Sequence, residues 1–111
     1  MQLTIAVPLH GNVSVSAWFY NHINHSVGVT DSLWYKISIG IPDCVADDNL
    51  GAWDIDSALP TAPYSGQLSP QRTFEVDTGT PTFYLNQQMM AGQDIGDLFV
   101  RGNMVAVFYP S

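Results

Sequence analysis

The chain has 111 residues, 46% of them hydrophobic, and carries ten Asp and Glu against three Lys and Arg, for a net charge of −7. A chain of this length usually forms one domain with its own core, so we expect a single domain over residues 1–111. Its few basic residues argue against nucleic acid and anionic membrane surfaces as partners, and no apolar run is long enough to span a bilayer.

Apolar and polar residues alternate with a period of two in six stretches of the chain. These stretches are 3–7, 13–19, 33–41, 74–76, 83–85 and 105–109. This alternation is typical of half-buried β-strands, and no 12-residue window shows a convincing helical period. Counting the weaker segments as well, we expect about eight strands in an all-β fold, a single antiparallel β-sandwich that is jelly-roll-like.

Two Gly-Asn pairs mark expected turns between strands. Gly11-Asn12 separates the first two apolar runs, and Gly102-Asn103 separates the last two. Glycine readily adopts the positive φ that tight hairpin turns require. The sequence therefore predicts an antiparallel hairpin at each of these two places.

Residues 42–71 break the alternating pattern. The segment holds four of the seven prolines and half of the ten acidic residues, and its alternation is weak. We expect a long acidic, proline-rich excursion over the surface, with one short strand around Trp53. Long ordered loops of this kind often carry binding sites.

Within this excursion, the stretch DDNLGAWDID at 47–56 concentrates side-chain oxygens that suit a hard cation such as calcium. The candidate ligands are Asp47, Asn49, Asp54 and Asp56, whose alternate spacing turns neighbouring side chains the same way. The spacing departs from the EF-hand pattern, and Asp and Asn also favour turns by bonding their own backbone. The two interpretations are therefore a calcium-binding loop and a solvated turn.

Several large aromatic residues are expected on the outer faces of the strands. If odd positions face the core between residues 13 and 41, then Trp18, Tyr20 and Trp34 point outward, and Tyr84 does so in its own strand. Outward aromatic residues are typical of subunit interfaces, and they also serve as platforms for the apolar faces of sugars. Both interpretations, a partner interface and a carbohydrate site, stay open at this point.

The last apolar run is hydrophobic on both of its faces. One face carries Met104, Ala106 and Phe108, and the other carries Val105, Val107 and Tyr109. A strand that is apolar on both faces is usually buried on both. We therefore expect this strand either at the centre of a sheet or against a partner chain, and Phe108 joins the outward aromatic residues as a candidate contact.

Residues that could support catalysis are sparse. The chain has no Gly-x-Ser-x-Gly motif, and the lone Cys44 stands beside Asp43, which disfavours a thiolate. His22 and His25 are too few for a zinc site by themselves. We therefore expect a non-enzymatic protein without a catalytic site or a cofactor, with calcium as the one metal that the acidic stretch at 47–56 would suit.

The strand count, the tight hairpins and the apolar last strand are similar to those of jelly-roll sandwiches, including viral capsid-type folds and trimeric C1q/TNF-like domains. With the outward aromatic residues, this favours a homo-oligomer, with a trimer as one form. The composition is poor in Lys and rich in Asn, Ser, Thr and Gly, as is typical of extracellular and virion surfaces. The N-terminus lacks the features of a signal peptide, which favours the virion setting.

Our leading hypothesis is therefore a structural or interaction module on a virion or extracellular surface, of the decoration, spike or capsid-associated type. It would contact copies of itself or other surface proteins. The alternative is a carbohydrate-binding module or lectin that binds glycans through the outward aromatic residues and the acidic loop. A small secreted hydrolase is the third hypothesis.

Overall fold

The computed structural model describes residues 1–92 and 98–111, with the side chains of 98–101 excepted. Eight strands and no helix occur among these residues. The strands are β1 (Gln2–Thr4), β2 (Gly11–His25), β3 (Asp31–Ile39), β4 (Gly51–Ile55), β5 (Ala62–Leu68), β6 (Gln71–Val76), β7 (Thr82–Ala91) and β8 (Leu98–Pro110). No helix in this part of the chain is long and apolar enough to cross a membrane.

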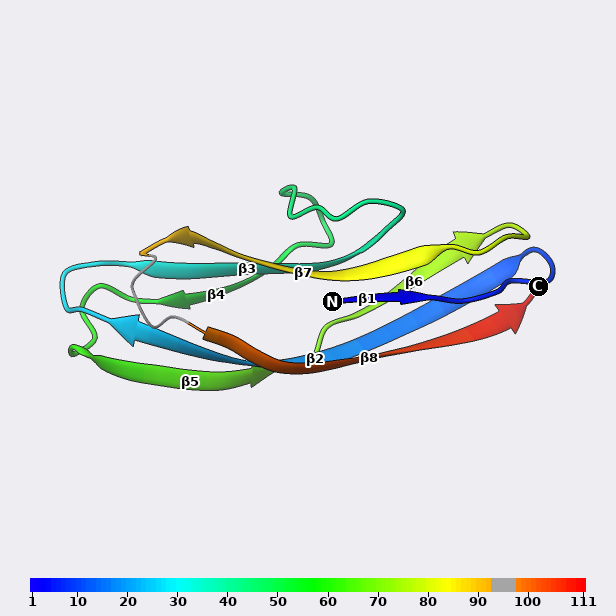
Figure 1. Cartoon of the computed structure of the whole chain (residues 1–111). Helices are drawn as coiled ribbons and strands as arrows, with labels where there is room; N and C mark the ends of the chain where they lie inside the picture. Colours follow the sequence, from blue (N-terminus) through cyan, green and yellow to red (C-terminus); the bar gives the residue numbers. More distant parts are fainter. Residues whose placement is uncertain (93–97) are drawn as a thin grey trace.

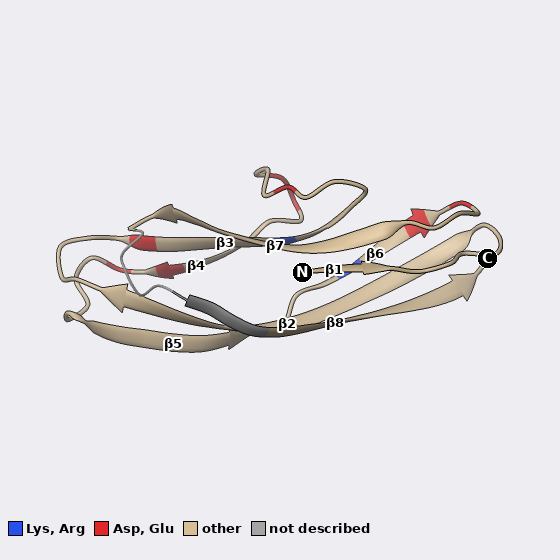
Figure 2. Ribbon diagram, in the orientation of Figure 1, with Lys and Arg blue, Asp and Glu red and all other residues tan. Residues whose placement is uncertain are grey.

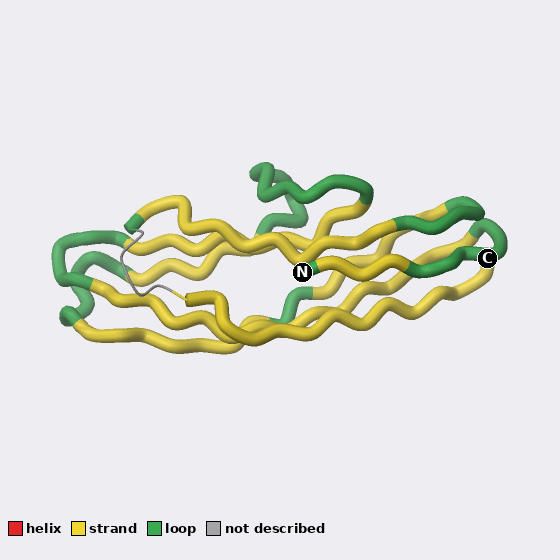
Figure 3. The backbone as a smooth tube through the Cα atoms, viewed as in Figure 1, coloured by secondary structure: helices red, strands yellow, loops and turns green. Residues whose placement is uncertain are grey.

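The strands form two antiparallel sheets that lie face to face as two layers, which confirms the predicted all-β sandwich (Figures 1 and 3). The first sheet has the order β1-β7-β3-β4. In the second sheet, β2 pairs with β6 through residues 11–16 and with β5 through residues 19–25. Because β8 pairs with residues 11–22 of β2, it must occupy the other edge of that strand, so β2 is central.

Strand β2 sets the length of the molecule. Its 15 residues span about 50 Å at about 3.4 Å per residue, close to the 52 Å long axis of the molecule. Along it, burial alternates at every position, with Val13, Val15 and Phe19 inside and Ser14 and Ser16 on the outside. The predicted every-other-residue packing of this strand is therefore confirmed.

The inner faces of the two sheets meet in one hydrophobic core. Its buried members are Val7, Val13, Val15, Ala17, Phe19, Leu33, Ile37, Phe74, Val76, Phe83, Leu85 and Met104. Strands β3 and β7 contribute alternate residues, as the sequence pattern predicts. Trp18 and Trp34 are not members of this cluster, and both are half-buried on the outer faces.

A buried polar contact ties the corner between the two sheets. His25 at the end of β2 bonds Asp31 at the start of β3 through Nδ1, and its Nε2 donates to the Leu59 carbonyl at 3.1 Å. Both side chains are buried, so the contact fixes the crossing from one sheet to the other. Gly92 lies against it with a φ of 74°, and a Cβ there would stand 2.0 Å from Asp31 Oδ1. This position therefore requires glycine.

The predicted hairpins at the two Gly-Asn pairs are wrong. Gly11 begins β2, Gly102 lies inside β8, and β1 pairs with β7 in the opposite sheet. Both glycines serve close approach between strands instead. A Cβ at Gly11 would stand 2.3 Å from the Tyr109 carbonyl, and one at Gly102 would stand 3.0 Å from the Trp18 carbonyl on the neighbouring β2.

The predicted excursion over 42–71 is also only partly a loop. The expected strand around Trp53 is β4, but β5 lies in the same segment and β6 begins at its end. Pro63 and Gly66 masked the strand character of β5, since both residues are depleted in strands. They are tolerated because β5 pairs along one side only, as an edge strand.

The side-chain amide of Asn21 is an unpaired polar group in the core, and replacing it tests how much this group costs in stability. It faces inward on β2, is buried, and neither of its polar atoms has a hydrogen-bond partner within the described residues. Removing an unpaired buried amide relieves a desolvation cost of about 1–3 kcal/mol, so we expect Asn21→Val to raise the free energy of unfolding in urea titrations.

Asn86→Val is the matched control, because the Asn86 amide donates to the Lys36 carbonyl at 3.0 Å and to Ser38 Oγ at 2.8 Å. This variant should lose about 1 kcal/mol or more. Equal destabilisation by the two substitutions would contradict the assignment of Asn21 as an unsatisfied group.

Candidate functional site

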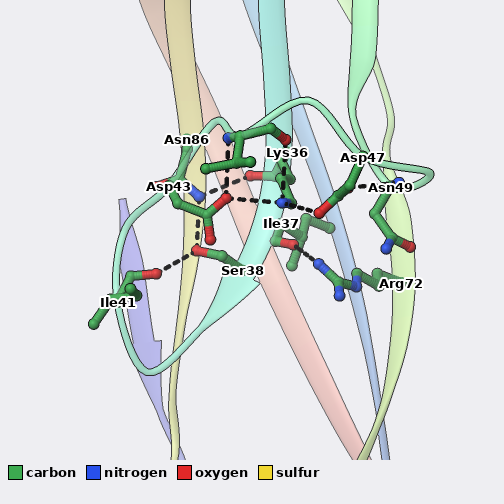
Figure 4. A network of polar contacts seen from close by, with 10 residues as sticks. Lys36, Ile37, Ser38, Ile41, Asp43, Asp47, Asn49, Arg72 and Asn86 are labelled. Carbon is green, nitrogen blue, oxygen red and sulfur yellow. Dashed lines mark hydrogen bonds and ion pairs between the residues drawn. The ribbon is translucent and has the colours of Figure 1, made fainter.

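The acidic loop, residues 40–50, rises from the outer face of the first sheet between β3 and β4 (Figure 1). Beneath it lies Lys36, whose side chain is only 4% exposed although it points away from the core. Its Nζ donates to Asp43 at 2.8 Å, to Asp47 at 2.6 Å and to the Val45 carbonyl at 3.3 Å (Figure 4). The loop is therefore held on the sheet by one buried ammonium group.

The electrostatics of this contact follow from the two charge pairs. Hydrogen bonds to Lys36 hold the pKa of Asp43 and of Asp47 below the ordinary value, with further lowering from the backbone N–H groups of Val45 and Asn49. In return, Asp43 and Asp47 raise the pKa of Lys36 above its ordinary value. The two carboxylates are thus satisfied by groups of the protein itself.

The structure does not bring the four predicted calcium ligands together. Asp47 turns toward Lys36 and also accepts from the Asn49 N–H, Asp54 on β4 accepts from Ser32 Oγ, and Asp56 accepts from the Ala58 N–H. Across the described residues, no group of three or more His, Cys, Asp or Glu could hold a metal ion. The local turn interpretation accounts for Asp47 and Asp56, because each caps a backbone N–H two residues ahead.

A small hollow lies beside the acidic loop, between it and β6. Its volume is about 240 Å³, and its lining includes Tyr35, Asp48, Asn49, Gln71 and Arg72. Arg72 is fixed there by a bond from Nη1 to the Ile37 carbonyl at 2.8 Å and by stacking of its guanidinium on Phe74. An aromatic ring can stack on the apolar face of a sugar, and amide, carboxylate and guanidinium groups can form hydrogen bonds with its hydroxyls. The sequence reasoning singled out Asn49 but missed Arg72, which is distant in the chain.

The five predicted aromatic contacts do not form one surface. Trp18 and Tyr20 lie on the outer face of the second sheet, where their rings meet edge to face at 5.8 Å. Trp34 and Tyr84 lie on the outer face of the first sheet, on β3 and β7. Phe108 points the other way, into the sandwich, and packs against the core.

The expectation that strand β8 lies at the centre of its sheet is wrong, since its described pairing is with β2 alone. It is an edge strand, and the exposed members of its outer row are Val105, Val107 and Tyr109, at 53%, 44% and 56% exposure. Phe108 is corrected to an inward position because it is paired with Val13, which faces the core. The sequence showed that both faces of β8 are apolar, but this pattern alone does not tell which of the two faces points into the core.

Charge is distributed unevenly between the two sheets. The acidic residues cluster on the first sheet, on its loops and at one end of the molecule, as Figure 2 shows. On the outer face of the second sheet, Glu75 on β6 is the only acidic side chain among the described residues. The part of that face formed by β2 and by residues 103–109 of β8 combines serines, the Trp18–Tyr20 pair and the apolar row, and it contains no Asp, Glu, Lys or Arg. It is the candidate interaction surface, and we call it the uncharged face.

Among the described residues, histidines with polar side-chain partners lie at three separate places: His10 beside Asp77 and Glu75, His22 beside Ser65, and His25 beside Asp31. His22 Nδ1 lies 2.9 Å from Ser65 Oγ on the outside of the second sheet, whereas the hollow is lined by neither residue. Burial, followed by the charge of Asp43, raises the pKa of the Cys44 thiol above its ordinary value, which disfavours the reactive thiolate. These positions add no argument for a hydrolase.

Comparison with known proteins finds no family model, no curated protein and no solved structure that matches this chain. Its function must therefore be argued from its own surfaces.

The Lys36 contact predicts a specific pH dependence. Because the pKa of Asp47 is lowered in the folded state, its contribution to stability is present above the ordinary value of 3.8 and is lost as the pH falls through the folded value. Asp47→Asn should therefore lower stability near pH 7 and flatten its decline toward about pH 2, measured by urea midpoints.

Asp48→Asn is the matched control, because it removes the same charge from the neighbouring position of the loop and has no bond to Lys36. It should keep the steep decline in acid. A steep acid decline in Asp47→Asn, parallel to that of the unmodified chain, would show that the Lys36 contact does not stabilise the loop.

Proposed function

We propose that this chain is a non-enzymatic structural module of a virion or extracellular surface, and that it assembles with copies of itself or with other surface proteins. The observation that supports this most is the uncharged face. A protein of net charge −7 places exposed valines and tyrosines beside the half-buried Trp18 on one sheet and keeps nearly all carboxylates off it. Exposed apolar and aromatic groups of this kind are typical of contact surfaces.

Electrostatic repulsion explains why the position of this face matters. Two copies of a strongly acidic chain repel each other, and like charges brought together at an interface weaken association. Contact through the first sheet would bring its acidic groups together, whereas contact through the second sheet would not. The uncharged face is therefore the surface through which copies can approach at the lowest electrostatic cost.

The proposal includes the virion or extracellular setting and a jelly-roll-like topology of the sandwich. The composition supports an outside-facing protein, and two antiparallel sheets with aromatic residues on their outer faces are compatible with capsid-associated sandwiches. The fold alone does not establish a function. A capsid or tail gene next to the coding sequence would support the virion setting.

Assembly is tested by light scattering of the purified chain at micromolar concentration. We expect a mass of at least two copies, and a trimer is one form that satisfies this. The association should strengthen from about 0.02 M to about 0.5 M salt, because salt screens the repulsion between copies while the contact itself is apolar. A monomer at both salt concentrations would contradict the proposal.

A carbohydrate-binding function is the second candidate, and the hollow beside the acidic loop favours it. Tyr35 offers a ring, while Asn49, Gln71 and Arg72 offer hydrogen-bonding groups around the same space of about 240 Å³. Sugars are bound by this combination of stacking and hydrogen bonding. Trp34 is on the same side of the molecule as the loop, whereas Trp18 and Tyr20 are on the other sheet.

A glycan array tests this alternative. If the hollow binds a sugar, Asn49→Ala should lower the signal at least about tenfold, since it removes a hydrogen-bonding group, while Trp18→Ala on the other sheet should leave it unchanged. The absence of any glycan signal from the unmodified chain would rule out this function at array concentrations.

A further inference from the structure

Among the residues that the structure describes, strand β8 is paired along one backbone edge only. All of its described pairing, from Leu98 to Pro110, is with β2. An edge strand presents a row of unpaired N–H and C=O groups that can pair with another chain, and proteins usually protect such edges with short strands, charged residues or proline. We therefore compared β8 with the other edge strands of this chain.

The other edge strands carry the usual protective features. Strand β1 has only three residues, and β4 has five with the exposed Asp54 among them. On the other edge of the second sheet, β5 contains Pro63 and β6 contains the exposed Glu75. Short length, charge and proline each discourage edge pairing.

Strand β8 has none of these features over most of its length. It is 13 residues long, and its segment Gly102–Tyr109 contains neither a charged residue nor a proline. The exposed row of this segment is apolar at Val105, Val107 and Tyr109. In a chain of net charge −7, this is the open edge that a second copy can approach without bringing carboxylates together.

We propose that β8 pairs edge to edge with β8 of a second copy, antiparallel about a two-fold axis at Ala106, so that the two second sheets join into one continuous sheet. This inference rests on the proposed assembly function and names the interface and its occupant. A two-fold axis perpendicular to the sheet makes the contact self-complementary and closes it at two copies.

The position of the axis follows from the sequence of the strand. Residues that face each other across an antiparallel pair lie on the same side of the sheet, so the outer row must pair with the outer row. With the axis at Ala106, the outer pairs are Val105 with Val107 and Asn103 with Tyr109, and Met104 meets Phe108 on the inner side. All residues from Gly102 to Pro110 then have a partner, and Pro110, which lacks an N–H, ends the ladder.

The joined sheet also explains the uncharged face. Because the axis is perpendicular to the sheet, the outer faces of both copies lie on the same side of the joined sheet. The Trp18–Tyr20 pairs and the valine rows of the two copies then form one extended surface. Larger assemblies can use this surface, whereas the edge contact itself makes a dimer.

Paired lysine substitutions test the edge contact. Val105→Lys with Val107→Lys places like charges directly opposite each other across the two-fold axis, which destabilises strand pairing. Ser14→Lys with Ser16→Lys is the control, because Ser14 and Ser16 are paired with Val107 and Val105 on the same outer face but lie on the central strand. Both variants change the net charge equally, and circular dichroism shows whether both remain folded.

We expect the valine variant to raise the dissociation constant of the dimer at least about tenfold and the serine variant to change it less than about threefold. Equal weakening by the two variants would show that copies stack through the uncharged face, and an unchanged constant in the valine variant would exclude the edge. Either result overturns edge pairing while an oligomeric unmodified chain still supports assembly. A monomeric unmodified chain overturns both proposals.

Disulfide cross-linking tests the register of the β8 pairing without adding charge to the strand. In a Cys44→Ser background, Val105→Cys and Val107→Cys chains are oxidised separately and as a mixture. Opposed positions lie about 5 Å apart, within disulfide reach, whereas the diagonal distance between two copies of one position is about 7–8 Å. The mixture should therefore form cross-linked dimers several-fold faster, and equal rates in all three samples would overturn the register and the pairing.

Discussion

The second sheet depends on one strand, because β5, β6 and β8 all pair with β2. Every inner position of β2 therefore determines which side of three other strands faces the core. A slip of one residue would move Val13, Val15 and Phe19 to the outside and bring Ser14 and Ser16 inside, which the core could not accommodate. The strict alternation of this strand is thus the constraint from which the two faces of the sheet follow.

The buried contacts at the first sheet complement this constraint. Lys36 points away from the core, and an exposed lysine would ordinarily occupy that position, yet the acidic loop covers it with two carboxylates. His25 and Asp31 fix the corner where the chain passes between the sheets. Much of the negative charge lies on the first sheet and its loops, and the outer face of the second sheet carries only Glu75 among the described acidic residues.

The two proposals follow from this separation of charge. A face without carboxylates and an open, uncharged edge lie on the same sheet, so one copy can meet another there with little repulsion. The hollow lies beside the acidic loop, where Asn49, Gln71 and Arg72 offer a different chemistry, based on hydrogen bonding. Assembly and ligand binding would therefore use separate parts of the molecule.

The sequence by itself determined the features that repeat over short distances. The period of two predicted the all-β fold, the core positions of β2 and the outward direction of Trp18 and Trp34, because neighbouring side chains of a strand point to opposite faces. Only the tertiary structure decided which partners meet across the chain. Gly11 and Gly102 were expected in turns and serve close approach instead, Phe108 faces inward, and Asp47 bonds Lys36 rather than the other predicted ligands. Each of these depends on which strand lies alongside or which loop folds back, and a local pattern carries no information about residues far away in the chain.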